Sequence, residues 1–347
     1  MSLLMVSLDK KIVEGKNRVE QPRVVRRMHK YSKEHSELHI IVFTKEGFFN
    51  DKPYSEKLWV HPTNSVSKIN YVLDAYRIGK KILKSKNEAR IKSFEITTQD
   101  PFFTGLVGLG LKRKFNISLE VQLHGDFYGS KFYSTGLFGI AQLLLGKFII
   151  KRADKIRVVS ERVKYNLINK LRVLENKIEV QPIKYGFQHL VKEKQKFDIH
   201  KRYPNFSKIF LYVGRFDPVK NLPWLIETFH KFLQIRPDSC LVIVGGTGET
   251  KEEKELRNLV QKMHIEENVK FDNFAHEVIS YYKSVDCLLV PSLSEGYGLV
   301  AMEAFYSGCK VIMTDVGVAN YELKPGEQVQ VTAINDREAF INAMSKI

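Results

Sequence analysis

Short apolar runs alternate with longer amphipathic stretches along most of this chain. In the first half, strands are expected at 3–7, 38–43, 93–97, 118–123, 155–159 and 178–181, and helices at 19–33, 69–84, 136–152 and 161–171. After a polar stretch at 192–207, strands are expected at 209–213, 240–244, 269–271, 287–290 and 310–313, with helices at 221–234, 251–263 and 298–307. Such alternation is typical of parallel sheets. We predict an α/β protein of two doubly wound lobes, 1–190 and 191–347, facing across a cleft.

One apolar stretch is longer than the others. Residues 137–150 are interrupted only by Gly139, Gln142, Gly146 and Lys147, and they fall short of the roughly 20 residues that span a bilayer. We expect a core helix here, and the neighbouring Lys and Arg residues leave open an element that dips into a membrane. The apolar start of the chain meets charged residues at once and predicts a first strand, not a signal peptide.

Charge is distributed unevenly. The net charge of the 347 residues is +16; residues 1–200 carry 38 Lys and Arg against 20 Asp and Glu, whereas residues 201–347 carry 17 against 19. Such a field favours an anionic partner, which could be a lipid surface, a nucleic acid or a phosphorylated substrate. A general excess of solvated lysines explains the same total.

The three cysteines, Cys240, Cys287 and Cys309, lie in apolar segments without a CxxC pair or a histidine cluster. This pattern predicts neither a disulfide framework nor a metal site, and it fits a reducing, cytoplasmic compartment.

Two cations follow the first strand of the second half. Gly214 and Arg215 come directly after the strand at 209–213, and Lys220 follows in the same turn. An arginine can form two parallel hydrogen bonds and a lysine acts as a point charge, so the pair suits a diphosphate. Taken alone, the segment is also typical of an ordinary surface turn in contact with solvent.

A second candidate anion site follows the strand at 287–290. Residues 291–298 form a turn that leads into a helix, and free amide groups at a helix start bind phosphate. Glu295 lies in the turn and Glu303 lies in the helix, so we expect them to hold different parts of one ligand instead of flanking a glycosidic bond. Glu303 suits the hydroxyls of a ribose, although an ordinary exposed glutamate is the alternative.

Together these segments resemble glycosyltransferase family 4, the glycosyl transferases group 1, which have the GT-B fold of two Rossmann-like lobes. The resemblance covers nearly the whole chain, and the segments 241–248, 269–274, 286–292 and 308–315 support it. It implies retaining transfer of a sugar from a UDP-, GDP- or ADP-sugar, with no metal and no cofactor. The donor-binding residues that it implies are Gly214, Arg215, Lys220, Glu295, Gly296, Tyr297, Gly298, Leu299 and Glu303.

The resemblance also suggests roles for particular residues. Arg215 and Lys220 would neutralise the leaving diphosphate, Glu303 would hold the ribose, and Glu295 would contact the donor sugar. His124, at the end of the strand at 118–123, resembles the family's strand-end His-Gly element next to the reacting carbon, with a structural histidine as the alternative.

Further polar residues of the first lobe are candidates for the acceptor side. Gln99 and Asp100 follow a strand and precede a helix that Pro101 would start, so Asp100 either caps that helix or contacts the acceptor. Asp126 follows His124 closely and could touch donor or acceptor. Ser160 is expected to cap the helix that carries Lys164 and to support the cleft.

Two features depart from the family pattern. The first strand is followed by a segment, 9–17, in which Gly15 is the only glycine, whereas many relatives have a glycine-rich loop there. After Asp336 one further helix is expected, so the C-terminal crossover helix looks short or missing, and the lobes would dock more loosely or need a partner.

The leading hypothesis is a cytoplasmic hexosyltransferase for cell-surface polysaccharide or glycolipid synthesis, peripheral at the inner face of the membrane, with a glycan or lipid-linked acceptor. A sugar-nucleotide epimerase or a phosphorylase of the same fold is one alternative, although no lysine is marked for pyridoxal phosphate. A basic nucleic-acid-binding protein is another, but the sequence contains no RRM, KH, zinc-finger or helix-turn-helix signature, and so no specific nucleic acid is expected.

Overall fold

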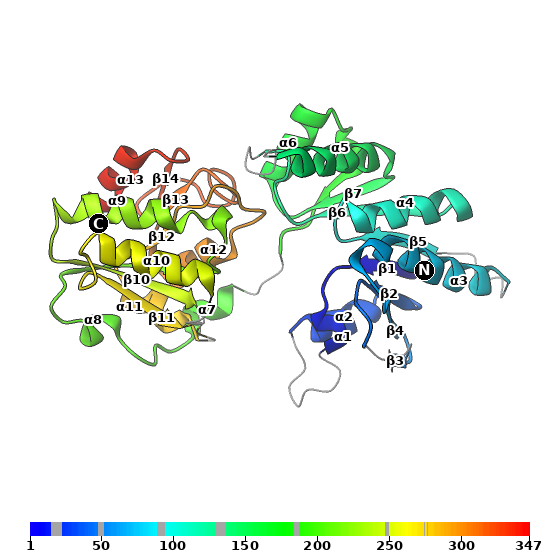
Figure 1. Cartoon of the computed structure of the whole chain (residues 1–347), viewed down its shortest axis with the longest axis horizontal. Helices are drawn as coiled ribbons and strands as arrows, with labels where there is room; N and C mark the ends of the chain where they lie inside the picture. The colour runs from blue at the N-terminus through cyan, green and yellow to red at the C-terminus, as the bar shows by residue number, and fades with distance from the viewer. Residues whose placement is uncertain are drawn as a thin grey trace. The chain divides into compact units, whose positions relative to one another are not determined.

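The computed structural model describes residues 1–14, 23–47, 52–88, 94–129, 136–183, 187–246, 250–273, 275 and 277–347. The chain forms two compact units (Figure 1). The first contains Met1–Val159 and Val163–Gln181, and the second contains Ser160–Arg162 and Pro182–Ile347. The chain therefore passes into the second unit after Gln181, whereas the sequence places the division at residue 190. Gly15, Lys16 and Asn17, the end of the segment that lacks a glycine-rich loop, lie outside the described residues.

The first unit contains an eight-stranded sheet in the order β3-β4-β2-β1-β5-β6-β7-β8, in which only the β3–β4 pair is antiparallel. Its six predicted strands are confirmed. The sequence did not predict the edge strand β3 or its neighbour β4, because both strands are short and each contains a proline. The strands are β1 (Ser2–Ser7), β2 (Leu38–Val42), β3 (Lys52–Ser55), β4 (Leu58–Pro62), β5 (Phe94–Thr98), β6 (Ser118–Leu123), β7 (Lys155–Val158) and β8 (Ile178–Val180).

Helices cover both faces of this sheet, and alternate residues of β1 show why. Leu4 and Val6 pack into the core beneath α3 to α6, whereas Leu3 and Met5 pack into the core beneath α1 and α2. A strand buried on both faces reads as a continuous apolar run, which is why β1 was recognisable from sequence. The helices are α1 (Lys11–Glu14), α2 (Arg23–Ser32), α3 (Tyr71–Glu88), α4 (Phe103–Phe115), α5 (Gly136–Arg152) and α6 (Glu161–Leu171).

Helix α5 agrees with the expected core helix on one side only. Gly146, Ile149 and Ile150 are buried, and Ile149 and Ile150 pack into the apolar core of the unit. Large apolar residues on its other side are exposed. An apolar run in a sequence does not show how much of a helix the protein itself covers.

The second unit contains a six-stranded, fully parallel sheet in the order β11-β10-β9-β12-β13-β14. The five predicted strands are confirmed, and β14 is additional. The strands are β9 (Lys208–Val213), β10 (Ser239–Gly246), β11 (Val269–Asn273), β12 (Cys287–Val290), β13 (Lys310–Thr314) and β14 (Val329–Thr332). Both units are thus Rossmann-like, and the predicted fold class is confirmed for each.

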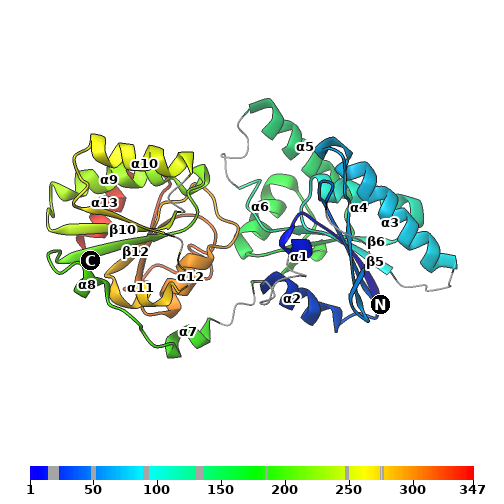
Figure 2. The same cartoon turned by 60° about the horizontal axis from the view of Figure 1, so that its bottom comes forward.

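The helices of the second unit also form two layers. Residues of α9, α10 and α13 pack into the apolar core on one face of the sheet, and α11 and α12 lie on the other face (Figure 2). The single helix expected after Asp336 is α13. The helices are α7 (Gln188–Lys192), α8 (Ile199–Arg202), α9 (Leu222–Leu233), α10 (Lys251–Lys262), α11 (Ile279–Ser284), α12 (Leu299–Tyr306) and α13 (Arg337–Ser345), with a 3₁₀ turn, η5, at Pro218–Lys220.

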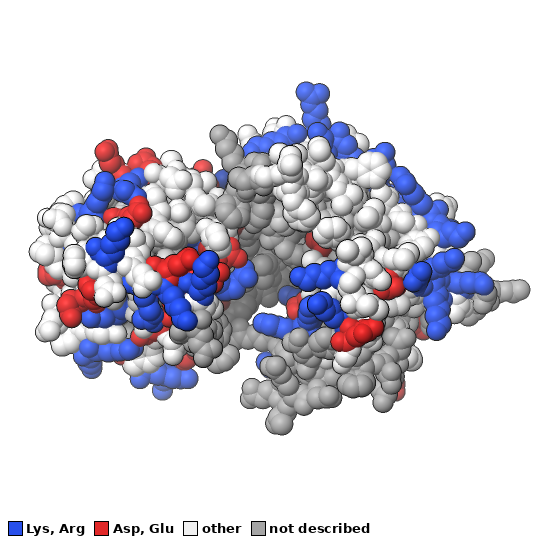
Figure 3. Space-filling model, viewed as in Figure 1, with Lys and Arg blue, Asp and Glu red and all other residues white. Residues whose placement is uncertain are grey.

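The surfaces of the two units differ in charge. Basic side chains dominate the visible face of the first unit, whereas basic and acidic side chains are interspersed over the second (Figure 3). All three cysteines are free and buried, as their sequence context predicts. Within the described ranges, no helix combines the length and the apolar composition needed to pass through a bilayer.

Candidate active site

The strand order of the second unit defines where a ligand is expected. Strand β9 has β10 on one side and β12 on the other, so the chain winds in opposite directions from the junction between β9 and β12. Ligands of open α/β sheets bind beyond the carboxyl ends of the strands at such a junction. The two predicted anion-binding turns, after β9 and after β12, both begin there.

The turn after β9 is fixed by close backbone packing. A Cβ atom placed on Gly245, at the end of β10, would lie 2.0 Å from the carbonyl oxygen of Gly214, so only glycine fits this approach. The Tyr212 hydroxyl donates to the Arg215 carbonyl at 2.9 Å, and the Asp217 carboxylate caps η5 by accepting from the Val219 amide at 3.1 Å. The sequence analysis did not identify Asp217 as a cap, although an aspartate before a proline is a common helix-start signal.

The two predicted cations differ in their surroundings. The Arg215 side chain is 82% exposed, and its Nη2 lies 3.9 Å from Asp217 Oδ2. The Lys220 side chain is only 18% exposed, and its Nζ lies 2.6 Å from Oε1 of Glu295, whose side chain is 10% exposed. Lys220 is therefore held in one position, whereas Arg215 extends into solvent.

The Lys220–Glu295 pair joins the turn after β9 to the turn after β12. The Leu293 amide donates to the Val219 carbonyl at 2.8 Å, which adds a backbone link between the same two turns. The Ser292 hydroxyl donates to Glu295 Oε1 at 2.8 Å. The sequence indicated Ser292 only as a residue after the strand; its role in orienting Glu295 depends on the fold.

The helix that follows the second turn begins at an uncapped end. Gly298 precedes α12 with a φ of 100°, and no side chain caps the helix. Leu299 is the first helical residue, so its amide is one of those without an intrahelical carbonyl partner. The Ser294 hydroxyl oxygen, in the same turn, is buried and has no hydrogen-bond partner among the described residues. Unpaired buried polar atoms cost free energy, so this turn has spare hydrogen-bonding capacity.

Close packing also fixes the residues between Glu295 and Gly298. A Cβ atom on Gly317, which has a φ of 55°, would lie 2.3 Å from the Tyr297 carbonyl oxygen and 2.8 Å from Glu295 Cβ. The Val318 amide donates to the Tyr297 carbonyl at 2.8 Å. The segment after β13 therefore holds Glu295 and Tyr297 in place, which the sequence did not indicate.

Glu303 is held separately from Glu295. It lies on α12 and accepts from the Tyr282 hydroxyl of α11 at 3.2 Å. The two glutamates thus have different partners. This arrangement agrees with the expectation that they do not form a pair across a scissile bond.

In the first unit, His124 lies just beyond the end of β6. Its Nε2 is 3.1 Å from the side-chain oxygen of Gln122, which fits a donated N–H from that nitrogen. The residue keeps a solvent-exposed side, yet the atoms packed around the ring remove part of the water that would stabilise the imidazolium. This partial burial, followed by the positive charges of Arg157 and Arg27, lowers the pKa of His124 to about 4. The ring is therefore neutral near pH 7.

Asp100 and Gln99, at the end of β5, have partners within their own unit. The buried Asp100 carboxylate accepts from the Phe102 amide at 2.6 Å and from the Thr104 hydroxyl at 2.8 Å. Burial raises its pKa. These bonds use the Asp100 carboxylate in the turn before α4, although the helix begins at Phe103 with Phe102, not Asp100, as its N-cap residue. The Gln99 side-chain oxygen accepts from the Ser7 hydroxyl at 2.6 Å.

Asp126 is also committed to local structure. It is buried, and its Oδ1 accepts from the Gly129 amide at 2.8 Å. The side-chain amide of Asn166 donates to both carboxylate oxygens, at 3.1 and 2.9 Å. Asp126 therefore ties the loop after β6 to helix α6.

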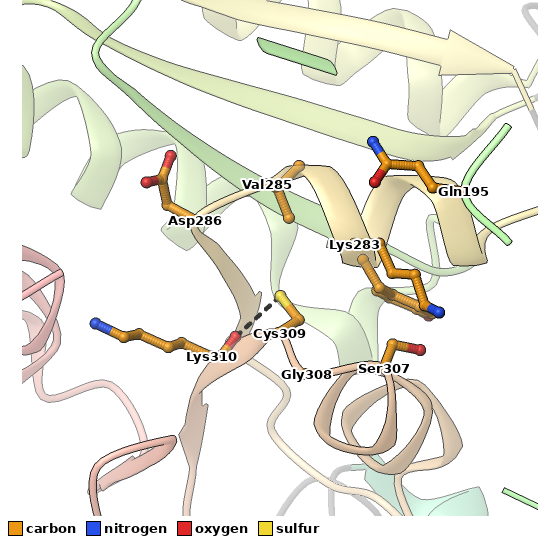
Figure 4. Close-up of a pocket in the computed structure, with 9 residues that line it drawn as sticks. Gln195, Lys283, Val285, Asp286, Ser307, Gly308, Cys309 and Lys310 are labelled. Carbon is orange, nitrogen blue, oxygen red and sulfur yellow. Dashed lines mark hydrogen bonds between the residues drawn. The ribbon is translucent and has the colours of Figure 1, made fainter. Parts of the chain in front are cut away.

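A hollow of the second unit lies elsewhere. It has a volume of about 460 Å³, and Figure 4 shows Asp286 and Lys310 where the chain enters β12 and β13. These are the amino ends of the strands, opposite the predicted site, and none of the predicted residues lines the hollow. Among the described residues, no group of three or more His, Cys, Asp or Glu side chains is arranged to hold a metal ion.

Known proteins share both the fold and part of the sequence. Residues 193–347 match a family model described as glycosyl transferases group 1. An uncharacterized glycosyltransferase of Methanocaldococcus jannaschii is 28% identical over 186 residues, 53% of this chain and 45% of that protein. A second one from the same organism is 29% identical over 297 residues, 81% of this chain and 71% of that protein. The chain thus spans less than half of the first of these relatives.

Solved structures resemble the chain over its whole length. Sucrose-phosphate synthase from Thermosynechococcus elongatus matches with a TM-score of 0.75 at 20% identity, covering 100% of this chain and 89% of that one. HepE of Anabaena, solved in complex with UDP-glucose, matches with a TM-score of 0.70 at 15% identity and the same coverage.

These likenesses define the class: the chain has the two-domain fold of the GT-B glycosyltransferases. The match of residues 193–347 to the model of the glycosyl transferases group 1 agrees with the resemblance that the sequence motifs indicated.

Proposed function

We propose that this protein transfers a sugar from a nucleotide diphosphate sugar to a glycan or lipid-linked acceptor, with retention of anomeric configuration as in glycosyltransferase family 4. The observation that carries the proposal is the Lys220–Glu295 pair, which joins the two turns at the strand junction of the second unit. A cation held in place at this edge of the sheet can stabilise the charge that develops on a leaving diphosphate, because it needs no reorganisation during the reaction.

Each donor-binding residue has a proposed role that fits its position. The amide groups at the start of α12, with the unpaired Ser294 hydroxyl, would bind phosphate oxygens. Lys220 would neutralise the diphosphate, and the exposed Arg215 would add a second charge. Glu303, oriented by Tyr282, would accept hydrogen bonds from the ribose, and Glu295 would contact the donor sugar. His124 of the first unit stays a prediction for the sugar side of the reaction.

We propose that the reaction uses no metal and no cofactor, because Lys220 and the helix amides supply the positive charge that a metal supplies in other transferases. Excess EDTA should leave turnover unchanged. A loss of activity that added Mg²⁺ or Mn²⁺ restores would contradict this.

The donor can be identified by thermal shift. Incubation with UDP-, GDP- and ADP-sugars should raise the melting temperature for one base, since a ligand at about 100 times its Kd stabilises by about 2.7 kcal/mol. Lys220→Gln should abolish the shift, and Lys254→Ala, which removes an exposed lysine of α10, should keep it. If no nucleotide sugar shifts the wild type, the proposal fails.

Transfer is favoured over the alternatives because the matched relatives carry glycosyltransferase names. Incubation of the nucleotide sugar alone, followed by NMR, separates glycosyl transfer from epimerisation. An epimerase would convert the donor, whereas a transferase needs an acceptor. The anomeric configuration of the product reports retention directly. We further propose that the protein works in cell-surface polysaccharide or glycolipid synthesis, in the cytoplasm and peripherally at the inner face of the membrane.

A further inference from the structure

Helix α5 of the first unit is apolar on both sides, and only one side is covered by the described protein. Its inner side is held by close contacts: a Cβ atom on Gly146 would lie 2.8 Å from the Phe102 ring and 2.3 Å from the Tyr128 hydroxyl oxygen. That hydroxyl donates to the Leu143 carbonyl at 3.0 Å. The orientation of α5 on the unit is thereby fixed.

The outer side of α5 exposes a continuous apolar stripe. Leu137 is 89% exposed, Leu144 is 62% exposed, and Ile140 and Phe148 are also exposed. Their spacing of three and four residues places them on one face of the helix. Phe138, 72% exposed, lies at the edge of this face. A row of large apolar side chains in water marks an interaction surface, whereas isolated ones do not.

The neighbouring helix α4 extends this surface. Phe103 and Leu106 of α4 are exposed, and a Cβ atom on Gly105 would lie 3.0 Å from Ile149 of α5, so the two helices pack closely. We call the exposed apolar residues of α4 and α5 the α5 face.

Basic residues border the α5 face. Lys147, Lys151 and Arg152 lie on α5, and Arg113 lies on α4. The Arg152 guanidinium carbon is 3.7 Å from the centre of the Phe148 ring, and that of Arg113 is 5.9 Å away. Neither helix contains an aspartate or a glutamate. Figure 3 shows uncharged surface over α5 with basic side chains along its edge.

This combination selects one occupant. An apolar stripe with cations along its border complements a bilayer with anionic headgroups, in which the apolar side chains enter the acyl region while the cations stay among the phosphates. A second copy of the chain is disfavoured, because pairing two α5 faces would bring like charges together.

We infer that the α5 face docks on an anionic lipid bilayer, with Leu137, Leu144 and Phe148 inserted and Lys147 and Lys151 on the headgroups. The inference deepens the membrane part of the proposed function and rests on it. It assigns the membrane contact to helix α5. The total charge of the first unit implied only a general attraction to anionic surfaces.

The apolar contribution is tested by flotation of the full chain with phosphatidylcholine vesicles that contain phosphatidylglycerol. Leu144→Gln/Phe148→Gln should weaken binding roughly a hundredfold, about tenfold for each side chain kept in water. Val66→Gln/Ile69→Gln changes two apolar residues of the same unit that are even more exposed, and this variant should bind like the wild type. Equal binding by both double variants would overturn the inference.

The charge contribution is tested on the same vesicles. Lys147→Ala/Lys151→Ala should weaken binding about thirtyfold, since each lysine near an anionic surface contributes on the order of 1 kcal/mol. The matched control is Lys30→Ala/Lys33→Ala, on the basic hollow of α2 lined by Arg26, His29, Lys30 and Lys33. If the control loses binding and the α5 variant keeps it, the docking surface is α2 and the inference is wrong.

Two further measurements separate the remaining outcomes. Sedimentation velocity without lipid should show the same oligomeric state for wild type and Leu144→Gln/Phe148→Gln; a dimer that the variant dissociates would assign the α5 face to a second copy. Nucleotide-sugar binding without vesicles should be unchanged in the variant. Retained vesicle binding with no nucleotide-sugar binding would refute the proposed function but leave the docking surface intact.

Discussion

The two units carry polar side chains at equivalent places, just beyond the carboxyl ends of parallel strands, but use them differently. In the first unit, the carboxylate oxygens of Asp100 and Asp126 accept hydrogen bonds from amides and side chains of their own unit. In the second unit, Lys220 and Glu295 join two separate turns, and the Ser294 hydroxyl has no hydrogen-bond partner in the part of the chain that the structure describes. A position at the end of a strand therefore does not define a role; the partners that the fold supplies do.

The largest effect is expected at Lys220. Lys220→Gln keeps a hydrogen-bond donor for Glu295 but removes the charge, and turnover should fall by about 10²–10³, as for the loss of one fixed donor to a developing anion. Steady-state kinetics with the donor found by thermal shift measure this. Lys254→Ala is the matched control. Wild-type turnover in Lys220→Gln would contradict the proposal that the strand-end residues of the second unit act on the substrate and those of the first unit act in local structure.

Asp100→Ala should act on stability instead. Removing the buried carboxylate leaves the Phe102 amide without its acceptor and the Thr104 hydroxyl with only the main-chain carbonyl of residue 100, which costs about 1–3 kcal/mol of unfolding free energy in urea titrations. Asp100→Asn, which keeps one acceptor oxygen, should recover most of it, and donor binding should not change in either variant. Full stability with lost transfer would instead make Asp100 an acceptor-side residue.

Asp100 should also affect the pH dependence of the unfolding free energy. Burial raises its pKa from 3.8, so the native state keeps this proton to higher pH than the unfolded chain does. The contribution of this group to stability therefore declines as pH rises from the unfolded to the folded pKa. Asp100→Asn should flatten that part of the stability profile.

Glu303→Ala should weaken donor binding by about 10- to 150-fold, because a charged hydrogen bond to the ribose contributes on the order of 1.5–3 kcal/mol. Isothermal titration calorimetry with the nucleoside diphosphate measures it, and an analogue that lacks the ribose hydroxyls should bind both proteins alike. Glu255→Ala, on the exposed side of α10, is the control. Unchanged affinity in Glu303→Ala would show that Glu303 does not bind the ribose.

The smallest effect concerns His124. Its folded pKa of about 4 lies below the unfolded value of 6.5, so the unfolded chain binds this proton first and stability falls as pH drops from 6.5 toward 4. His124→Gln should lessen that fall in thermal melts at a series of pH values, whereas His230→Gln in the second unit should not. Identical profiles for wild type and His124→Gln would place the imidazole in an unperturbed environment.

Most of the fold could be predicted from sequence because buried parallel strands are continuous apolar runs. The edge strand β3 and its neighbour β4 were missed, since strands at or next to an edge can be short and contain a proline. Within the site, the Gly214–Lys220 turn and the Glu295–Glu303 segment were recognisable as motifs. Asp217, Tyr282 and Ser292 were not assigned their roles, because no spacing rule links them to their partners.

The sequence by itself determined the alternation of strand and helix, the residue types of the two anion-binding turns and the excess of positive charge in the first half, because these are local properties of the chain. Tertiary structure decided which polar groups find partners and which apolar side chains stay uncovered. Lys220 meets Glu295 across 75 positions, and the outer side of α5 stays exposed, because burial and pairing depend on neighbours that only the folded chain brings together.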